Sequence, residues 1–177
     1  VKMRYMFSSG RTLACLALLL CAAGCSTPSQ SVNTYRMGDT IQLGKLVYNV
    51  YESRWLTHLG EGTAARIPRD RFFLVRMSIS NAGSEEILVP AVTATDESGH
   101  TCRELENGES VPEWLGLLRP VRPGESLQGN VVFDCAPRNY KLRLADESEQ
   151  RTALVDIPLT FGAEIPELPA PEFPEKK

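Results

Sequence analysis

An alternating apolar run near the middle of the chain restricts its fold more than any other feature of the sequence. Every second position of this run is apolar, at Phe73, Val75, Met77 and Ile79. A period of two places these side chains on one face of a β-strand. Phe72 and Leu74 make the start of the run apolar on both faces, which predicts a strand in the interior of its sheet. The run stops at residues 81–83, an Asn-Ala-Gly triplet typical of a turn.

Similar short runs, separated by turn residues, recur along most of the chain. We predict strands over residues 41–50, 72–80, 87–95, 100–105, 127–135, 140–144 and 153–157. The apolar phase of the first run slips at Gly44-Lys45, where we expect a bulge or a kink at which the strand changes sheet. Because no helical period is present, about seven strands predict an all-β, immunoglobulin-like antiparallel β-sandwich.

The first 25 residues have the pattern of a bacterial lipoprotein signal. Lys2, Arg4 and Arg11 precede an apolar stretch over residues 12–23. That stretch is too short to cross a bilayer, which needs about 20 apolar residues in a helix. It ends in Ala-Ala-Gly and Cys25, so we expect cleavage before Cys25 and acylation of its sulfur and amino group.

Two residues near this cysteine bear on the address of the protein. Ala22 stands three residues before Cys25, where Leu is commoner, so an ordinary secretory signal cleaved nearby is the alternative. Ser26, rather than Asp, follows the cysteine. By analogy with enterobacterial sorting, Ser26 favours the periplasmic face of the outer membrane.

The composition of the chain suggests four segments. We predict a signal peptide over 1–24, a flexible tether over 25–34, the sandwich domain over 35–162 and a disordered, proline-rich tail over 163–177. Removing the three basic residues of the signal from the 19 Lys and Arg leaves 16, against 22 Asp and Glu, a net charge of −6. This balance argues against nucleic acid as a partner.

Two of the five cysteines remain for the exported domain. Cys15 and Cys21 leave with the signal and Cys25 receives lipid, so Cys102 and Cys135 are left. Because the compartment is oxidising, we expect these two to form a disulfide. Two reduced core thiols are one alternative. Another is a zinc site of His100 and Cys102, which Cys135 or Asp96 would approach, although the usual zinc-ligand spacing is missing. We predict no metal and no cofactor.

The strand pattern also resembles a known family. The residues that carry the resemblance are Leu43-Gly44 with Tyr48-x-Val50, the run 73–83, Asp96-x-x-Gly99, Pro123-Gly124-Glu125, the run 129–137 and Tyr140-x-Leu142. Together they are similar to the telokin-like, immunoglobulin-fold domain of unknown function numbered 4352, common in bacterial lipoproteins. The resemblance spans about residues 35–160. It implies a sandwich fold and an envelope location, and it brings no catalytic residue.

Two long segments without strand pattern carry the candidate binding residues. Residues 52–70 contain Trp55, and residues 106–122 contain Trp114. Long loops in a compact domain are often functional, and tryptophan is a frequent interface anchor. The alternative for Trp114 is that it and its neighbours fill the open end of the sandwich as a satellite core.

Catalytic motifs are missing from the sequence. The only histidines are His58 and His100, and no nucleophile elbow, zinc-protease motif or phosphate-binding loop is present. We therefore predict a non-catalytic binding or structural module, held at the membrane by lipid on Cys25 and acting on an unknown envelope protein. A protease inhibitor or chaperone-like factor is the alternative, and a hydrolase using either histidine is a weaker one.

Overall fold

The computed structural model describes residues 32–160 of the 177-residue chain. These residues form eleven strands and one short 3-10 turn, Gly62–Ala64. The strands are β1 (Asn33–Arg36), β2 (Thr40–Leu43), β3 (Leu46–Leu56), β4 (Arg71–Asn81), β5 (Ile87–Val89), β6 (Thr93–Asp96), β7 (Thr101–Arg103), β8 (Arg119–Val121), β9 (Ser126–Cys135), β10 (Tyr140–Ala145) and β11 (Thr152–Ile157). The predicted signal, Cys25 and the predicted tail lie outside the described residues. Within residues 32–160, no helix is long and apolar enough to cross a membrane.

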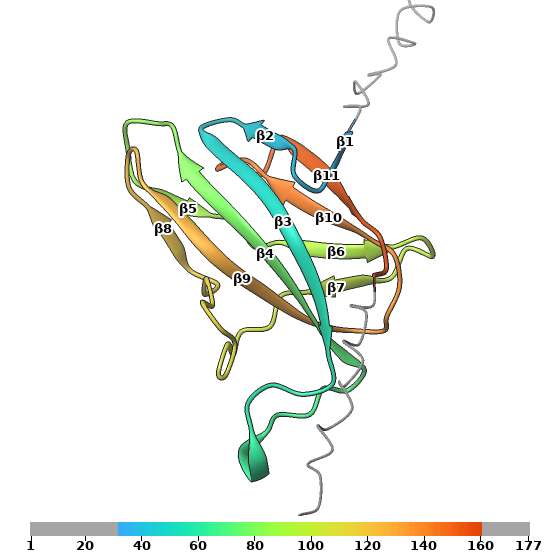
Figure 1. The fold of residues 1–177 in the computed structure, drawn as a ribbon. Helices are drawn as coiled ribbons and strands as arrows, with labels where there is room; N and C mark the ends of the chain where they lie inside the picture. The colour runs from blue at the N-terminus through green and yellow to red at the C-terminus, as the bar shows by residue number, and fades with distance from the viewer. Residues whose placement is uncertain (1–31, 161–177) are drawn as a thin grey trace, which may run out of the picture. The chain divides into compact units, whose positions relative to one another are not determined.

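Two sheets pack face to face as a sandwich (Figure 1). The first has the order β1-β11-β10-β6-β7 and the second the order β2-β3-β4-β9, while β5 and β8 pair separately. The predicted all-β sandwich is confirmed. It differs from the prediction in having eleven described strands instead of about seven, and in having β1 parallel to β11. Three of the additional strands, β5, β7 and β8, have only three residues each.

The central position of β4 follows from its apolar residues on both faces. It pairs with β3 on one side and with β9 on the other along its length. Phe73, Val75 and Met77 are fully buried between the two sheets. Phe72 and Leu74 point to the outer side, where they form a second, smaller core with Val132 and with residues of two long loops. The sequence prediction of an interior strand is therefore correct.

The prediction for the start of the domain needs two corrections. Gly44-Lys45 is not a bulge or a change of sheet: Leu43 pairs with Leu46, so these two residues are the turn of a β2–β3 hairpin. Gly44 has a φ of +58°, the left-handed backbone that such a turn requires. The bulge lies further on, at Tyr51, because Val50 pairs with Met77 and Glu52 with Arg76. It leaves Tyr51 as the extra residue of β3.

Other predicted boundaries also change. Residues 87–95 are two strands in different sheets, β5 and β6, because Pro90 between them has no N–H to continue a ladder. The predicted loop over 106–122 contains strand β8, and β3 extends to Leu56, into the predicted loop over 52–70. Strand β1 begins at Asn33, inside the predicted tether, where it pairs with Ala153.

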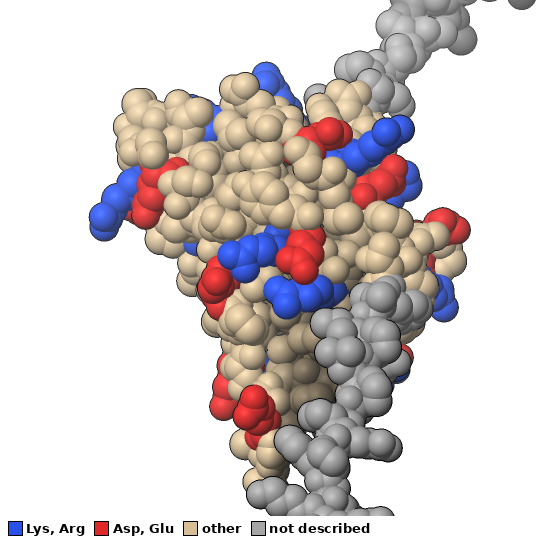
Figure 2. Space-filling view, viewed as in Figure 1, with Lys and Arg blue, Asp and Glu red and all other residues tan. Residues whose placement is uncertain are grey.

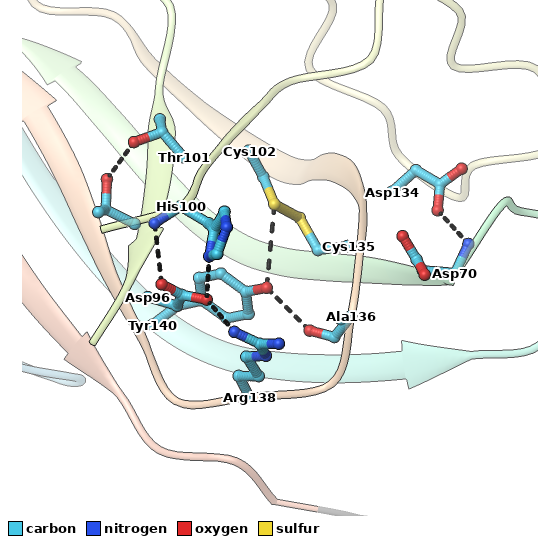
Figure 3. Close-up of a disulfide and its surroundings, with 11 residues drawn as sticks. Asp70, Asp96, His100, Thr101, Cys102, Asp134, Cys135, Ala136, Arg138 and Tyr140 are labelled. Carbon is cyan, nitrogen blue, oxygen red and sulfur yellow. Dashed lines mark hydrogen bonds and ion pairs between the residues drawn. A yellow bond between two sulfur atoms is a disulfide. The ribbon is translucent and has the colours of Figure 1, made fainter. Parts of the chain in front are cut away.

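A tyrosine corner and a disulfide hold together the end of the sandwich where β9 turns into β10 (Figure 3). The Tyr140 hydroxyl donates to the Ala136 carbonyl at 2.8 Å, a contact common in immunoglobulin-like sandwiches. Cys102 and Cys135 form a disulfide with a Cα–Cα distance of 6.3 Å, as the sequence predicts. Cys102 lies on β7 and Cys135 on β9, so the bond joins one strand of each sheet.

Loss of this disulfide should lower stability without changing the fold. The two cysteines are 33 residues apart, and the chain-entropy model assigns such a loop about 3–4 kcal/mol. We expect Cys102→Ala with Cys135→Ala to lose about that free energy of unfolding in denaturant melts. Unaltered protein purified without reductant should show no titratable thiol from this pair in denaturant; two free thiols would contradict the assignment.

Candidate functional site

Trp55, the first candidate anchor, belongs to the core and not to an exposed loop. The bulge at Tyr51 shifts the alternation of β3 by one residue, which turns Trp55 inward opposite Phe73. The two rings stack with centroids 4.4 Å apart, and the Tyr140 ring lies 6.0 Å from the indole. The indole is half-buried, and its Nε1 has no hydrogen-bond partner among the described residues. The prediction of a surface role for Trp55 on a loop is therefore wrong about its location.

The loop between β3 and β4 is held in place by Arg66. Leu59 and Arg66 exchange two backbone hydrogen bonds, of 3.0 and 2.8 Å, so the loop is a small hairpin. The Arg66 guanidinium donates to the carbonyls of Asn107 and Glu109 in the second long loop, at 3.1 and 2.8 Å. Its carbon also lies 5.5 Å above the Phe72 ring. The Arg66 side chain therefore links both long loops to the second, smaller core around Phe72.

The segment that carries Trp114 is attached to the free edge of β9. The backbone N–H of Asn130 donates to the Glu113 carbonyl at 2.8 Å, and the Leu115 N–H donates to the backbone carbonyl of Asn130 at 3.1 Å. This close approach requires Gly129, because a Cβ there would lie 2.1 Å from the Glu113 carbonyl oxygen. Glu113 itself has a φ of +46°, which is uncommon for a residue other than glycine. Its carboxylate pairs with Arg76 at 2.7 Å.

Trp114 lies on the surface of this segment. Its side chain packs on Gly108, where a Cβ would lie 1.8 Å from the indole. The residue remains 37 % exposed. The satellite core that the sequence allows does exist, but Val111 and Leu105 enter it and Trp114 does not. The structure therefore places the two tryptophans in different environments, one between the sheets and one at the surface.

A buried ion pair that the sequence analysis missed fixes both ends of the Trp114 loop. Arg119 pairs with Glu104, and their side chains are 0 % and 3 % exposed. The other Glu104 oxygen accepts a hydrogen bond from the Val92 amide at 2.8 Å. Burial raises the pKa of the Glu104 carboxyl and the Arg119 charge lowers it, with a net increase. Charged residues are rarely buried, and nothing near these two in the sequence marks them as exceptions. Sequence reasoning therefore places them at the surface.

The β6–β7 turn brings together Asp96, Ser98 and His100. Figure 3 shows Asp96 and His100. The Ser98 hydroxyl donates to Asp96 Oδ1 at 2.7 Å and lies 2.7 Å from Nδ1 of His100. The same imidazole nitrogen lies 3.6 Å from Asp96 Oδ2. In a catalytic triad the serine and the carboxylate contact opposite nitrogens of the histidine. This cluster instead has the hydrogen-bond pattern of a closed turn, and Arg138 covers it with a 2.7 Å ion pair to Asp96.

The structure also locates the residues of the alternative zinc site and of the alternative hydrolase. In the alternative zinc site, Cys102 and Cys135 are joined to each other, which leaves no free thiolate as a ligand. Among residues 32–160, no three His, Cys, Asp or Glu side chains lie together as a metal site. His58 is exposed on the β3–β4 loop, with Nδ1 3.0 Å from the Thr57 hydroxyl.

Comparisons with known proteins identify solved structures with a similar fold, but no family. No protein-family model matches the chain, and no curated protein matches it. The chain is similar to the solved yjhA protein of Bacillus subtilis, with a TM-score of 0.55 and 16% identity over 70% of this chain and 98% of that chain. It is also similar to MPT63, a secreted protein of Mycobacterium tuberculosis, with a TM-score of 0.52 and 13% identity over 73% of this chain and 99% of that one.

A third solved structure is an uncharacterized β-sandwich protein of Clostridium difficile 630, with a TM-score of 0.49 and 11% identity over 72% of this chain and 95% of that one. At these identities the likeness concerns the fold alone. The likeness to the first two structures is consistent with the β-sandwich described above. The narrower resemblance to family 4352 stays a prediction.

The Asp96 carboxylate should make stability fall in acid. Hydrogen bonds from Ser98, then from His100 and Arg138, lower its pKa well below 3.8, although burial opposes them. A lowered folded-state pKa stabilises the fold above the unfolded-state value and loses this effect as the pH falls through the acid range. Asp96→Asn should therefore lower the free energy of unfolding at pH 7. Its free energy of unfolding should also fall less in acid than that of the unaltered chain, as measured by denaturant melts at pH 7 and in the acid range. Asp156→Asn, on an exposed carboxylate, is the matched control; an equal acid dependence in all three proteins would contradict the prediction.

Proposed function

We propose that this chain is a cell-envelope lipoprotein whose sandwich is a non-catalytic, protein-binding or structural module. The anchor would be lipid on Cys25, and the location the periplasmic face of the outer membrane. The signal pattern before Cys25 supports the anchor. The Cys102–Cys135 disulfide fits an oxidising compartment, and one solved protein with this fold is secreted.

The observation that carries the binding role is an exposed indole on a fixed loop. Trp114 is 37 % exposed, and hydrogen bonds to Asn130 hold the backbone on either side of it. A large aromatic side chain that is already ordered loses little conformational entropy on binding. We therefore assign Trp114 as the anchor of the partner surface, and Trp55 as a core residue.

The path of the chain would place the β3–β4 loop at the end of the sandwich away from the lipid anchor. Asn33 follows Cys25 by eight residues, which span at most about 30 Å when extended. Asn33 pairs with Ala153, next to the β10–β11 turn, and Glu147 of that turn accepts a hydrogen bond from Lys45 in the β2–β3 hairpin. The β3–β4 loop is at the other end of the eleven-residue strand β3 (Figure 1). The lipid anchor would thus attach at the end of the sandwich opposite the β3–β4 loop.

The anchor is tested by Cys25→Ala. This variant should lack the thiol that receives lipid, remain unlabelled by palmitate and leave the membrane fraction. Metabolic labelling and membrane fractionation measure both effects. Labelling of Cys25→Ala, or lack of labelling of the unaltered chain, would contradict the lipoprotein assignment.

The binding role is tested by Trp114→Ala. We expect capture of the partner from envelope extract to weaken by about 2 kcal/mol or more, roughly thirtyfold in Kd. The free energy of unfolding should fall by less than the roughly 3–5 kcal/mol typical of a buried aromatic, because the indole is partly exposed. Leu88→Ala, which removes another exposed apolar side chain, serves as the control. Unchanged capture, or a loss of unfolding free energy as large as that of a buried aromatic, would contradict the assignment of Trp114 as the anchor.

A further inference from the structure

The outer face of β2, β3, β4 and β9 carries a regular array of uncharged polar side chains. Thr40, Asn49, Ser78 and Gln128 are direct register partners, one from each of the four strands. The next row along the strands is Gln42, Val47, Ser80 and Ser126. Together these two rows form a surface we call the neutral face. Neighbouring strands are about 4.8 Å apart, so the neutral face extends about 14 Å from β2 to β9.

Tyr51 borders the neutral face and lies across it. The β3 bulge leaves this residue unpaired, so that Tyr51 and Glu52 both point outward. The Tyr51 hydroxyl lies 2.7 Å from the Ser78 hydroxyl on the neighbouring strand, so the ring follows the sheet surface. The residue is nevertheless 48% exposed. Bulges often redirect side chains at functional surfaces, and this one provides an aromatic ring beside rows of hydroxyl and amide groups.

The composition of the neutral face narrows the class of ligand. Neither row contains a charged residue, and Figure 2 shows an area without charged side chains on this side of the molecule, bordered by charged ones. The charged border includes the next register pair, Glu52 and Arg76. An anionic polymer or an anionic membrane would need cations here. Val47 and Tyr51 are the only apolar side chains, far fewer than the largely apolar interface of a stable homodimer requires.

We propose that the neutral face binds a neutral glycan chain. Sugar hydroxyls both donate and accept hydrogen bonds, and so do side-chain amides. Thr40 donates to Asn49 Oδ1 at 3.0 Å, Ser80 donates to Ser126 at 2.9 Å, and Ser78 is buried beside the Tyr51 hydroxyl. The groups left to bind sugar are therefore Asn49 Nδ2 and the amides of Gln42 and Gln128. The C–H side of a sugar ring carries partial positive charge, which is attracted to the negative face of an aromatic ring. Tyr51 would stack against one sugar, while Asn49 and Gln128 bind its neighbours. This site is separate from Trp114 and does not rest on the proposed protein-binding role.

The test uses the ¹⁵N-labelled full chain in a zwitterionic detergent without a sugar headgroup. Chitotetraose and cellotetraose are the neutral probes, and a sulfated oligosaccharide is the anionic comparison, each titrated into the millimolar range. We expect a neutral probe to shift backbone amides of β2, β3, β4 and β9 around Tyr51. Tyr51→Ala should weaken the affinity at least tenfold, whereas Tyr51→Phe, which keeps the ring, should retain most of it. Leu88→Ala removes an exposed side chain on β5 and should bind like the unaltered chain.

Several results would overturn the proposal. They are the lack of any shift with both neutral probes, shifts on another face, preference for the sulfated probe, and equal affinity of Tyr51→Ala and the unaltered chain. Line broadening of the same amides with protein concentration alone would instead identify a self-association surface. The ¹⁵N spectrum of Tyr51→Ala shows directly whether the variant is folded, and if it is not, Gln128→Ala replaces it with the same expected loss of affinity.

Discussion

The two-sided burial of β4 is the constraint on which the rest of the structure depends. A strand with apolar residues on both faces needs a cover on each side, and a single facing sheet supplies only one. Phe73, Val75 and Met77 are covered by the five-stranded sheet. Phe72 and Leu74 are covered by the β3–β4 and β7–β8 loops, which supply Leu59 and Val111. The long loops are therefore part of the folded core, which explains why each has specific polar contacts to hold it.

The contacts that hold the loops are polar and come from distant parts of the chain. Arg66 bonds two carbonyls of the other loop, and Asn130 bonds the backbone beside Trp114. The Arg119–Glu104 pair closes the base of the same loop inside the protein. Separating the two partners of a buried pair leaves uncompensated charges inside the protein, so loop conformations that part Arg119 from Glu104 are disfavoured. The fixed loop conformation supports the proposal that Trp114 anchors a partner.

A single bulge determines which aromatic side chains are available at the surface. Before Tyr51, odd-numbered residues of β3 point outward, and after it even-numbered residues do. The shift turns Trp55 into the core and leaves Tyr51 outside, on the neutral face. Without the extra residue, Trp55 would lie on the outer face and the stack on Phe73 would be lost. The two surfaces proposed for binding therefore depend on different local devices, a loop attached to β9 and a bulge in β3.

The sequence by itself determined the fold class, the interior position of β4 and the expected pairing of Cys102 with Cys135. Each of these follows from local periodicity, turn chemistry or the small number of cysteines. Tertiary structure alone decided the bulge at Tyr51, the hairpin at Gly44-Lys45, the split at Pro90 and the buried Arg119–Glu104 pair. The bulge depends on the register of β3 with β4, and the ion pair joins residues 15 apart in the chain. The hairpin and the split are local, but each is defined only by the strand that its residues pair with. Alternation shows that a phase changes but not whether a turn or a bulge changes it, and a charged residue carries no local mark of the partner that allows its burial.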